Sequence, residues 1–417
     1  MSLFPLLRSS ANSNYRILLG QVIIDIFTYS MLVPYFPSIF LTGHGKYAGH
    51  NKNAGQSTWG IAQTVGNLMG VLSGFCSGVL SDKFGRRGAV VCNQALAAVS
   101  CFGMAYGYLN LDRSFSLSFL IAGYVGRKGN RTLPLLVASM ADITDGKGLQ
   151  ARLSTTNAFV GFAFALGPAL GALLAGYLTT TAIFVSAGLM CSVHAIIACF
   201  LLHDGSHRKQ SSWVTWSLIK STVLNHKRTY AIHFFGCLGQ QCYIATIGLV
   251  ALHRFHLEGP KYGYLISFFG ISYGVSQFAF VPMLSTFLHD ENFRLQCGLL
   301  LLSISRLALG IVHTVPMLLL LHVFVGLGSG IFKQTLSVSI NRTNKAVGGT
   351  KNGTADSIER FSGVIAPLIA LPAHHFYATD TGPSPGAVLA SAFYFLAFML
   401  SVQKRSIDPP YRSKKTK

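Results

Sequence analysis

Apolar segments of about 20 residues recur along almost the whole of this chain, and they limit its fold more than any other feature. A helix needs about 20 mostly apolar residues to cross the hydrocarbon core of a bilayer. Twelve such segments lie near residues 15–40, 58–80, 88–108, 115–140, 153–177, 180–202, 229–253, 261–284, 295–313, 315–340, 354–377 and 386–402. Only 11% of the 417 residues are charged, against about 25% in a soluble domain. The sequence predicts an all-α membrane protein with twelve transmembrane helices.

The longest polar connection divides the twelve segments into two sets of six. It contains Trp213 and Trp216, and tryptophan is typical of a membrane surface. We expect an N-terminal six-helix bundle over residues 1–202, a cytoplasmic linker over 203–228, a C-terminal six-helix bundle over 229–402 and a basic cytoplasmic tail over 403–417.

The basic residues indicate the orientation of the chain rather than a nucleic-acid partner. The formal charge of +20 is dispersed in short clusters between the apolar segments and forms no stripe on a soluble face. With both termini in the cytoplasm, 22 lysines and arginines fall on the cytoplasmic side and five on the other, as the positive-inside rule requires. The sequence predicts a multi-pass integral membrane protein with cytoplasmic termini, and no signal in it distinguishes the plasma membrane from an organelle membrane.

Cysteine and histidine spacing gives no sign of a metal site. All eight cysteines fall in or beside apolar segments, which predicts buried free thiols. His203 and His207 have helical spacing but no third ligand, and His233 is expected to be a hydrogen-bonded packing residue, although a buried histidine can also carry protons. No Walker loop, nucleophile elbow or dinucleotide fingerprint occurs in a usable context. We therefore expect no metal, no cofactor and no enzyme.

The sharpest motif is GVLSDKFGRR, residues 78–87, between the second and third segments. Gly78 permits close helix approach and Gly85 permits a tight turn. Asp82 can pair with Arg86 or Arg87, or accept helix N-terminal N–H groups. These residues predict a charge latch that holds one conformation; the alternative is an ordinary basic loop.

An acidic residue, Asp25, lies inside the first apolar segment. An ionised carboxylate there costs about 2.5–3.5 kcal/mol on insertion scales, so Asp25 must face a cavity, find a partner or bind a proton. It is our first proton-coupling candidate, and the alternative is a structural aspartate tied to a neighbouring helix. Arg127, Lys128 and Arg131 lie close together in the fourth segment, where they can pair with Asp25 or bind an anionic group.

The second half carries its own embedded charges, Arg306, Lys333, Glu359 and Arg360. Snorkelling or mutual pairing can explain each of them. Glu359, paired with Lys333 or Arg360, is the second proton-coupling candidate. Four aromatic residues are candidates for lining a cavity that takes an amphipathic ligand: Tyr29, Phe36, Tyr243 and Tyr273.

The fifth segment has small residues four apart and an internal proline. Gly167 and Gly171 belong to this stripe, which lets helices approach closely, and Pro168 bends the span. A plain packing role and a role in coupling both remain open.

These motifs resemble the major facilitator superfamily. Residues 78–87 match its loop signature G-x-L-x-D-x-x-G-R-[RK], and residues 167–171 resemble the G-P-x-x-G motif of proton-coupled antiporters. Residues 24–37 and 141–146 resemble the tetracycline:proton antiporters, and residues 263–270 resemble organic-cation-transporter-like animal members. One departure is that the family's arginine in the fourth segment is missing from its ungapped position at 123 or 124.

The resemblance implies a major facilitator fold with two pseudo-symmetric six-helix bundles. It also implies a secondary active transporter, with drug efflux by proton-coupled antiport as the leading interpretation. The expected partners are a small organic substrate, protons and the bilayer, and a monomer is expected. A facilitative uniporter or proton symporter is the alternative within transport. The connection at 287–294 keeps Asp290 and Arg294 but lacks glycines, which leaves open a transport-inactive receptor or scaffold.

Overall fold

The protein is described by a computed structural model that covers residues 10–37, 39, 52–110, 115–130, 132–133, 135, 146–202, 223–224, 226–257, 260–341, 348–377 and 382–403. Every long regular element in these ranges is a helix. The helices of the first half are α1 (Ser10–Leu32), α2 (Tyr35–Pro37), α3 (Lys52–Phe84), α4 (Arg86–Leu109), α5 (Ser116–Lys128), α7 (Gly146–Leu174) and α8 (Thr180–Leu201). Those of the second half are α10 (Lys227–Phe255), α11 (Pro260–Val275), η3 (Ser276–Phe280), α12 (Val281–Phe287), α13 (Glu291–Ile311), α14 (Val315–Asn341), α15 (Gly348–Tyr377) and α16 (Pro385–Val402).

The helices α11, η3 and α12 follow one another without a break, because η3 is a five-residue π-helical turn inside one long helix. Counting them as one span and setting the short α2 aside gives twelve helices, as the sequence predicted. The expected linker at 203–228 lies largely outside the described residues, so the domain boundaries stay a prediction.

Nine of the described helices are long and apolar enough to cross a membrane on their own. The other three are α3, α5 and α15. The helix α5 has only 13 described residues, while α3 and α15 carry polar side chains along their length. The side chain of Asn67 in α3 donates a hydrogen bond of 2.8 Å to the backbone oxygen of Gly363 in α15. The polar helices thus satisfy part of their hydrogen-bonding capacity by packing against each other.

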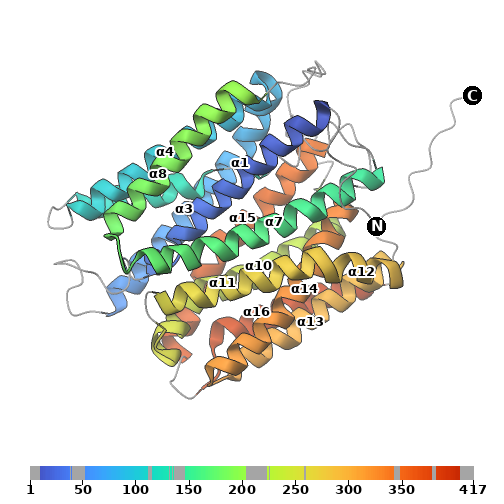
Figure 1. Cartoon of the computed structure of the whole chain (residues 1–417). Coiled ribbons are helices and arrows are strands. Elements are labelled where there is room, and N and C mark those ends of the chain that lie inside the picture. The colour runs from blue at the N-terminus through green and yellow to red at the C-terminus, as the bar shows by residue number, and fades with distance from the viewer. Residues whose placement is uncertain are drawn as a thin grey trace, which may run out of the picture.

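Each half of the chain has its own hydrophobic core. Met31, Met104 and Phe184 belong to the buried cluster of the first half, and Leu299 and Val325 belong to that of the second half. In the first half α4 packs on α5 and α8, and α1 packs on α7; in the second, α10 packs on α15 and α16, and α13 on α14 and α16. Figure 1 shows the helices of the two halves side by side.

Among the described helices, the halves are joined mainly by the packing of α7 on α11 and of α3 on α15. Glycines allow the first contact to be close. A Cβ atom added to Gly161 of α7 would lie 2.6 Å from the Cα atom of Gly274 in α11, and one added to Gly270 would lie 2.6 Å from the backbone nitrogen of Ala165. Because no side chain fits between the backbones, small residues at these positions set the distance between α7 and α11.

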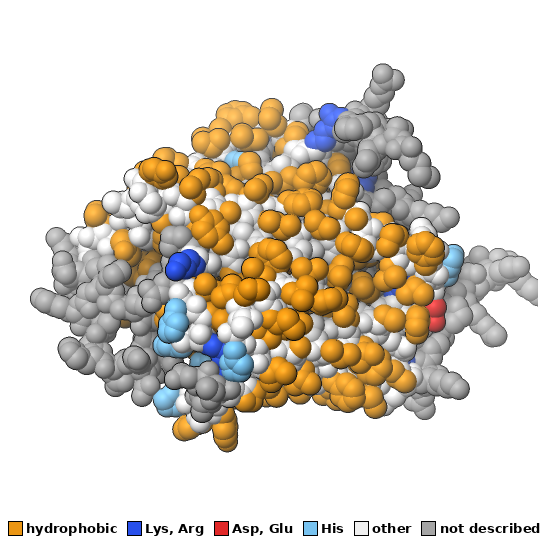
Figure 2. Space-filling view, turned by 60° about the horizontal axis from the view of Figure 1, so that its bottom comes forward, with side chains coloured by type: hydrophobic (Ala, Val, Ile, Leu, Met, Phe, Trp, Pro, Cys, Tyr) orange, Lys and Arg blue, Asp and Glu red, His pale blue; other side chains and the backbone are white. Residues whose placement is uncertain are grey.

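The outer surface is strongly apolar. Figure 2 shows hydrophobic side chains spread over the middle of one face, with lysine, arginine and histidine nearer its margins. Large apolar residues such as Val99, Phe200 and Ile304 are more than half exposed. Such a continuous apolar surface is typical of contact with lipid.

Candidate functional site

The carboxylate of Asp25 forms a buried ion pair with Arg127. Nη1 of Arg127 lies 2.7 Å from Oδ1 of Asp25, and the two side chains are 1% and 9% exposed, respectively. Nη2 of Arg127 donates to the backbone oxygen of Asp25 at 2.7 Å and to Oγ1 of Thr28 at 2.9 Å. The guanidinium therefore joins α5 to α1 through three hydrogen bonds, two of them to one residue.

Arg127 lies in the last turn of α5, beside a break in the expected span of 115–140. The helix α5 ends at Lys128, and residues 132, 133 and 135 are helical again after Gly129 and Asn130, so the bounds of this span stay a prediction. Oδ1 of Asn130 accepts hydrogen bonds from the backbone nitrogen and the hydroxyl of Thr132 at 3.1 and 2.8 Å, the pattern of an N-cap residue before the helical residues that follow. The last turn of a helix also favours a positive charge. Arg131 lies outside the described residues.

Aromatic rings surround the cationic groups of this site. The Arg127 guanidinium lies 5.7 Å from the ring centre of Tyr29, and Nζ of Lys128 lies 5.6 Å from it. Lys128 is also 5.7 Å from the ring of Tyr124, against which Phe36 packs edge-on at 4.8 Å. Tyr29 is thus beside the ion pair, while Phe36 is buried in the core of the first half.

The Gly167-Pro168-Gly171 motif faces α1, the helix that carries Asp25. A Cβ atom on Gly167 would lie 2.7 Å from the backbone oxygen of Phe27, and one on Gly171 would lie 2.5 Å from that of Met31. Pro168 lies inside α7. The two glycines therefore pack α7 against α1, whereas the backbone oxygen of Pro168 would lie 3.0 Å from a Cβ atom on Gly263 of α11 in the second half.

A second ion pair lies in the other half of the molecule. Nζ of Lys333 in α14 is 3.2 Å from Oε1 of Glu359 in α15, and the two side chains are 41% and 29% exposed. Arg360 instead pairs with Asp356, one turn earlier on the same helix, at 3.8 Å. Lys333 and Glu359 are more open than the first pair, although both lie well inside long helices.

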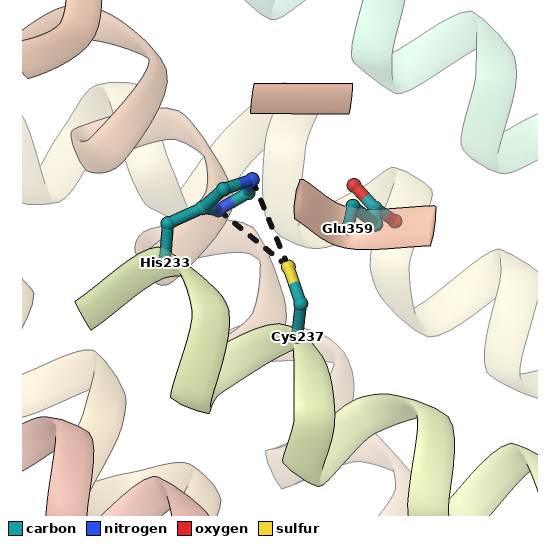
Figure 3. Close-up of side chains that lie close together, drawn as sticks. All are labelled: His233, Cys237 and Glu359. Carbon is teal, nitrogen blue, oxygen red and sulfur yellow. Dashed lines mark hydrogen bonds between the residues drawn. The ribbon is translucent and has the colours of Figure 1, made fainter. Parts of the chain in front are cut away.

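Two more side chains lie close to Glu359, as Figure 3 shows. They are His233 and Cys237 of α10, and one ligand atom from each of the three residues lies within 4.8 Å of the others. Neither residue was predicted from the sequence to belong to a site. Their spacing of four residues was the available signal, but the contact between α10 and α15 supplies the third member.

Arg306 and Tyr243 lie in the core of the second half. Arg306 is fully buried, with its guanidinium 3.7 Å from the centre of the Tyr243 ring. Its Nη2 donates to Oε1 of Gln240 at 2.8 Å, and the Tyr243 hydroxyl contacts Nε2 of His322 at 3.0 Å. Tyr273, the remaining cavity candidate, is half-buried in α11 at the contact with α7, beside Gly161.

The motif at 78–87 links α3 to α4 through a single glycine. Gly85 has φ 91° and precedes the first residues of α4, Arg86 and Arg87. Gly78 and Asp82 lie in the last turns of α3. The side chains of residues 75–84 and 86 are outside the described part, so the latch stays a prediction. Arg87 is exposed.

Among the described cysteines, Cys92, Cys101, Cys191, Cys199, Cys237, Cys242 and Cys297 are free thiols, as the sequence predicted. Cys92 is exposed, and Cys199 and Cys297 are partly exposed. The expectation of burial was wrong for Cys92 because the outward face of a membrane helix meets lipid, where an apolar thiol is tolerated.

Twelve described helices in two halves, with the ion pair of Asp25 and Arg127 buried among them, define the class of multi-pass membrane proteins that includes transporters. The sequence model of the protein family named Major Facilitator Superfamily matches residues 18–228, which is half of the chain. The chain belongs to the major facilitator superfamily, a family of transporters and not of enzymes.

Relatives are distant. The class C tetracycline resistance protein of Escherichia coli is 27% identical over 202 residues, which span 48% of this chain and about half, 46%, of that protein. The class G tetracycline resistance protein of Vibrio anguillarum is 26% identical over 366 residues, 83% of this chain and 86% of the relative. Major facilitator superfamily domain-containing protein 10 of Mus musculus is 22% identical over 371 residues, 82% of this chain and 77% of the relative.

Solved structures confirm the fold. The crystal structure of the human organic anion transporter MFSD10 (TETRAN) superimposes with a TM-score of 0.72 at 18% identity, covering 94% of this chain and all of that one. A partially occluded inward-open structure of the E. coli xylose transporter XylE gives a TM-score of 0.71 at 12% identity, with 94% and 97% coverage. The predicted major facilitator fold is therefore confirmed.

Proposed function

We propose that this protein is a secondary active transporter that exports a small organic molecule in exchange for protons by alternating access. The observation that carries the proposal is the buried ion pair of Asp25 and Arg127. A carboxylate at this depth is stable only while it is paired or protonated, so the site has two defined states.

Protonation changes what Arg127 can bind. When Asp25 accepts a proton, its attraction for the guanidinium falls, and a buried cation that loses its partner is destabilised by about 3–5 kcal/mol. Arg127 then needs another acceptor, and an acidic group on the substrate is one. An acidic substrate and the Asp25 carboxylate thus compete for Arg127, which links substrate binding to the protonation of Asp25.

Helix contacts offer a route from this site to the other half. The helix α1 carries Asp25 and packs on α7 through Gly167 and Gly171. The helix α7 in turn packs on α11 of the second half through Gly161. A shift of α1 after Asp25 is protonated would therefore reach the contact between the halves in two steps.

The surroundings of the ion pair suggest the substrate class. Tyr29 and Tyr124 provide apolar ring faces, and Arg127 and Lys128 provide positive charge. These groups suit a molecule with an apolar body and an acidic group. Relatives include tetracycline resistance proteins and a human organic anion transporter, which agrees with an amphipathic cargo.

The driving force for the proposed export is the proton gradient. One proton moving down this gradient supplies about 1.4 kcal/mol per pH unit and about 2.3 kcal/mol per 100 mV of membrane potential.

The test is substrate-evoked proton movement in proteoliposomes, with candidate aromatic acids and lipophilic cations compared. Export should be driven by an inward proton gradient, with protons moving opposite to substrate, and Asp25→Asn should lose this coupling. The matched control is Asp290→Asn: Asp290 is an exposed carboxylate that caps α13 by accepting from the backbone nitrogen of Asn292, and asparagine caps a helix equally well.

Other outcomes select the alternatives. Substrate flux that ignores pH would replace antiport with facilitated diffusion, and protons moving with substrate would indicate a symporter. A folded protein that moves none of the compounds in either direction would favour a receptor or scaffold. We also propose that both termini face the cytoplasm, which protease access to the C-terminal tail in sealed cells or organelles would test.

A further inference from the structure

His233, Cys237 and Glu359 have the chemistry and spacing of metal ligands. His233 and Cys237 are one helical turn apart on α10 and are 9% and 2% exposed. Glu359 reaches them from α15, and the three ligand atoms all lie within 4.8 Å of one another (Figure 3). Imidazole, thiolate and carboxylate are all ligands that zinc accepts.

The hydrogen bond made by Nε2 of His233 leaves Nδ1 as the ring nitrogen that can bind a metal. Its Nε2 lies 2.9 Å from the backbone oxygen of Ala355, and because a carbonyl only accepts, Nε2 carries the hydrogen. In the neutral ring Nδ1 then accepts from the thiol of Cys237, whose Sγ lies 3.5 Å away, and its lone pair becomes available to a metal when that thiol loses its proton. Metal-ligating histidines commonly donate their other N–H to a backbone carbonyl in this way.

The separation of the two atoms fits a tetrahedral cation. Zinc lies about 2.0–2.1 Å from nitrogen and about 2.3 Å from sulfur. At a tetrahedral angle, these bond lengths place the nitrogen and the sulfur about 3.5 Å apart, the distance found between Nδ1 of His233 and Sγ of Cys237. Sγ of Cys237 also lies 3.9 Å from Nε2, so the sulfur lies beside the ring rather than along the Nδ1 lone pair, and the imidazole must turn to place one cation between the two atoms.

Charged neighbours set the conditions for binding. Nζ of Lys333 donates a hydrogen bond of 3.2 Å to Oε1 of Glu359, and its positive charge opposes the binding of a cation. Asp356 and Arg360 pair with each other, so their charges offset one another. Binding releases the thiol proton of Cys237, and the thiolate with the Glu359 carboxylate then neutralises a divalent cation. Cation and Lys333 compete for the same carboxylate.

We propose that Nδ1 of His233, Sγ of Cys237 and a carboxylate oxygen of Glu359 form a binding site for a divalent transition-metal cation of the zinc class. The cation replaces Lys333 as the partner of Glu359 and joins α10 to α15. Three protein ligands leave a fourth position for water or another small ligand. The site does not depend on the proposed proton exchange, and each can fail without the other.

The test titrates Co²⁺ into the full-length protein purified in detergent. Cobalt in a tetrahedral site absorbs in the visible, and a thiolate ligand adds a charge-transfer band in the near ultraviolet. Saturable binding at one equivalent, reversed by Zn²⁺, is expected. Cys237→Ser should abolish the thiolate band and weaken binding at least tenfold. The control is Cys242→Ser, because Cys242 is a buried free thiol on the same helix outside the cluster, and its spectrum should be unchanged.

Two further measurements complete the test. Lys333→Gln should bind Co²⁺ more tightly, since the competing ammonium is gone. In the wild-type protein, Zn²⁺ should slow alkylation of Cys237 and not that of Cys242, read by mass spectrometry of the two sites; this comparison needs no variant to fold. A thiolate band that survives Cys237→Ser, weaker binding by Lys333→Gln, or alkylation of Cys237 that is indifferent to Zn²⁺ would overturn the proposal.

Discussion

At the scale of single residues, the position of Asp25 depends on Arg127. The guanidinium donates to the side chain and to the backbone oxygen of Asp25 and to the hydroxyl of Thr28. A planar group with several donors can make these contacts together, whereas a lysine presents one point charge. The pair therefore fixes how the guanidinium is oriented against α1, and it also balances the two charges.

Removing the guanidinium should destabilise the first half strongly. Arg127→Ala leaves a buried carboxylate without its partner and should lower the free energy of unfolding by about 3–5 kcal/mol. Arg127→Lys should cost less, and the double variant Asp25→Asn with Arg127→Gln should recover much of the loss because no buried charge remains. Unfolding in mixed detergent micelles measures all three. Equal loss in the double variant would show that the charges are not coupled.

Gly85 has a backbone conformation that only glycine adopts easily. Its φ of 91° and ψ of 157° fall in a region that is essentially restricted to glycine. Gly85→Ala should therefore destabilise the protein by about 1–3 kcal/mol, seen as a lower melting temperature. The control is Gly88→Ala in α4, where an added Cβ meets nothing within 4 Å and alanine favours helix.

At the scale of helices, α7 uses two neighbouring faces for two different contacts. Gly167 and Gly171 meet α1, while Gly161 meets α11 in the other half. The small-residue stripe was visible in the sequence, but periodicity cannot say which neighbour each face touches. Packing of specific helix pairs supplies that information.

A methyl group on the α1 side of α7 should separate these helices. Gly171→Ala places Cβ 2.5 Å from the backbone oxygen of Met31, so the helices must shift, and overpacking typically costs about 1–3 kcal/mol. We expect a lower melting temperature and slower flux. Gly103→Ala in α4 is the matched control, because its Cβ would meet nothing within 4 Å. Unchanged stability in Gly171→Ala would mean that the contact yields easily.

The twelve spans could be predicted because hydropathy acts over 20 residues at a time, whereas the site depends on single contacts. The sequence placed Asp25 and Arg127 among the candidates but did not predict the break in helix after Lys128, because the hydrogen bonds of Asn130 that accompany this break are local and specific. The sequence left open whether Lys333 or Arg360 pairs with Glu359. In the structure Arg360 pairs instead with Asp356, which lies one turn away on the same helix.

At the scale of the whole molecule, the halves meet along α7 with α11 and along α3 with α15. Alternating access requires that one end of such contacts opens while the other closes. An open groove of about 490 Å³ lies between α3 and α15, lined by apolar residues and by Thr64 and His375. This seam is the natural place to ask whether the halves move.

A reversible cross-link between α3 and α15 should stop transport. A Cβ atom on Gly60 would lie 2.8 Å from a methyl carbon of Leu371, so Gly60→Cys with Leu371→Cys brings two thiols together. Oxidation should reduce substrate flux at least tenfold and a reductant should restore it, while each single cysteine variant responds to neither. Full flux in the oxidised double variant would show that this seam stays closed throughout the cycle.

The modest hydropathy of α3 and α15 also bears on how the chain is made. A ribosome delivers α3 early and α15 near the end, so α3 enters the membrane long before the amide of Asn67 can reach its partner carbonyl on Gly363. During that interval the first half holds a polar helix with unmet hydrogen bonds, exposed to lipid and to quality control. Maturation of this protein is therefore expected to be a post-translational event, completed when its penultimate helix arrives, and chains truncated before α15 should be degraded rather than accumulate as a stable half.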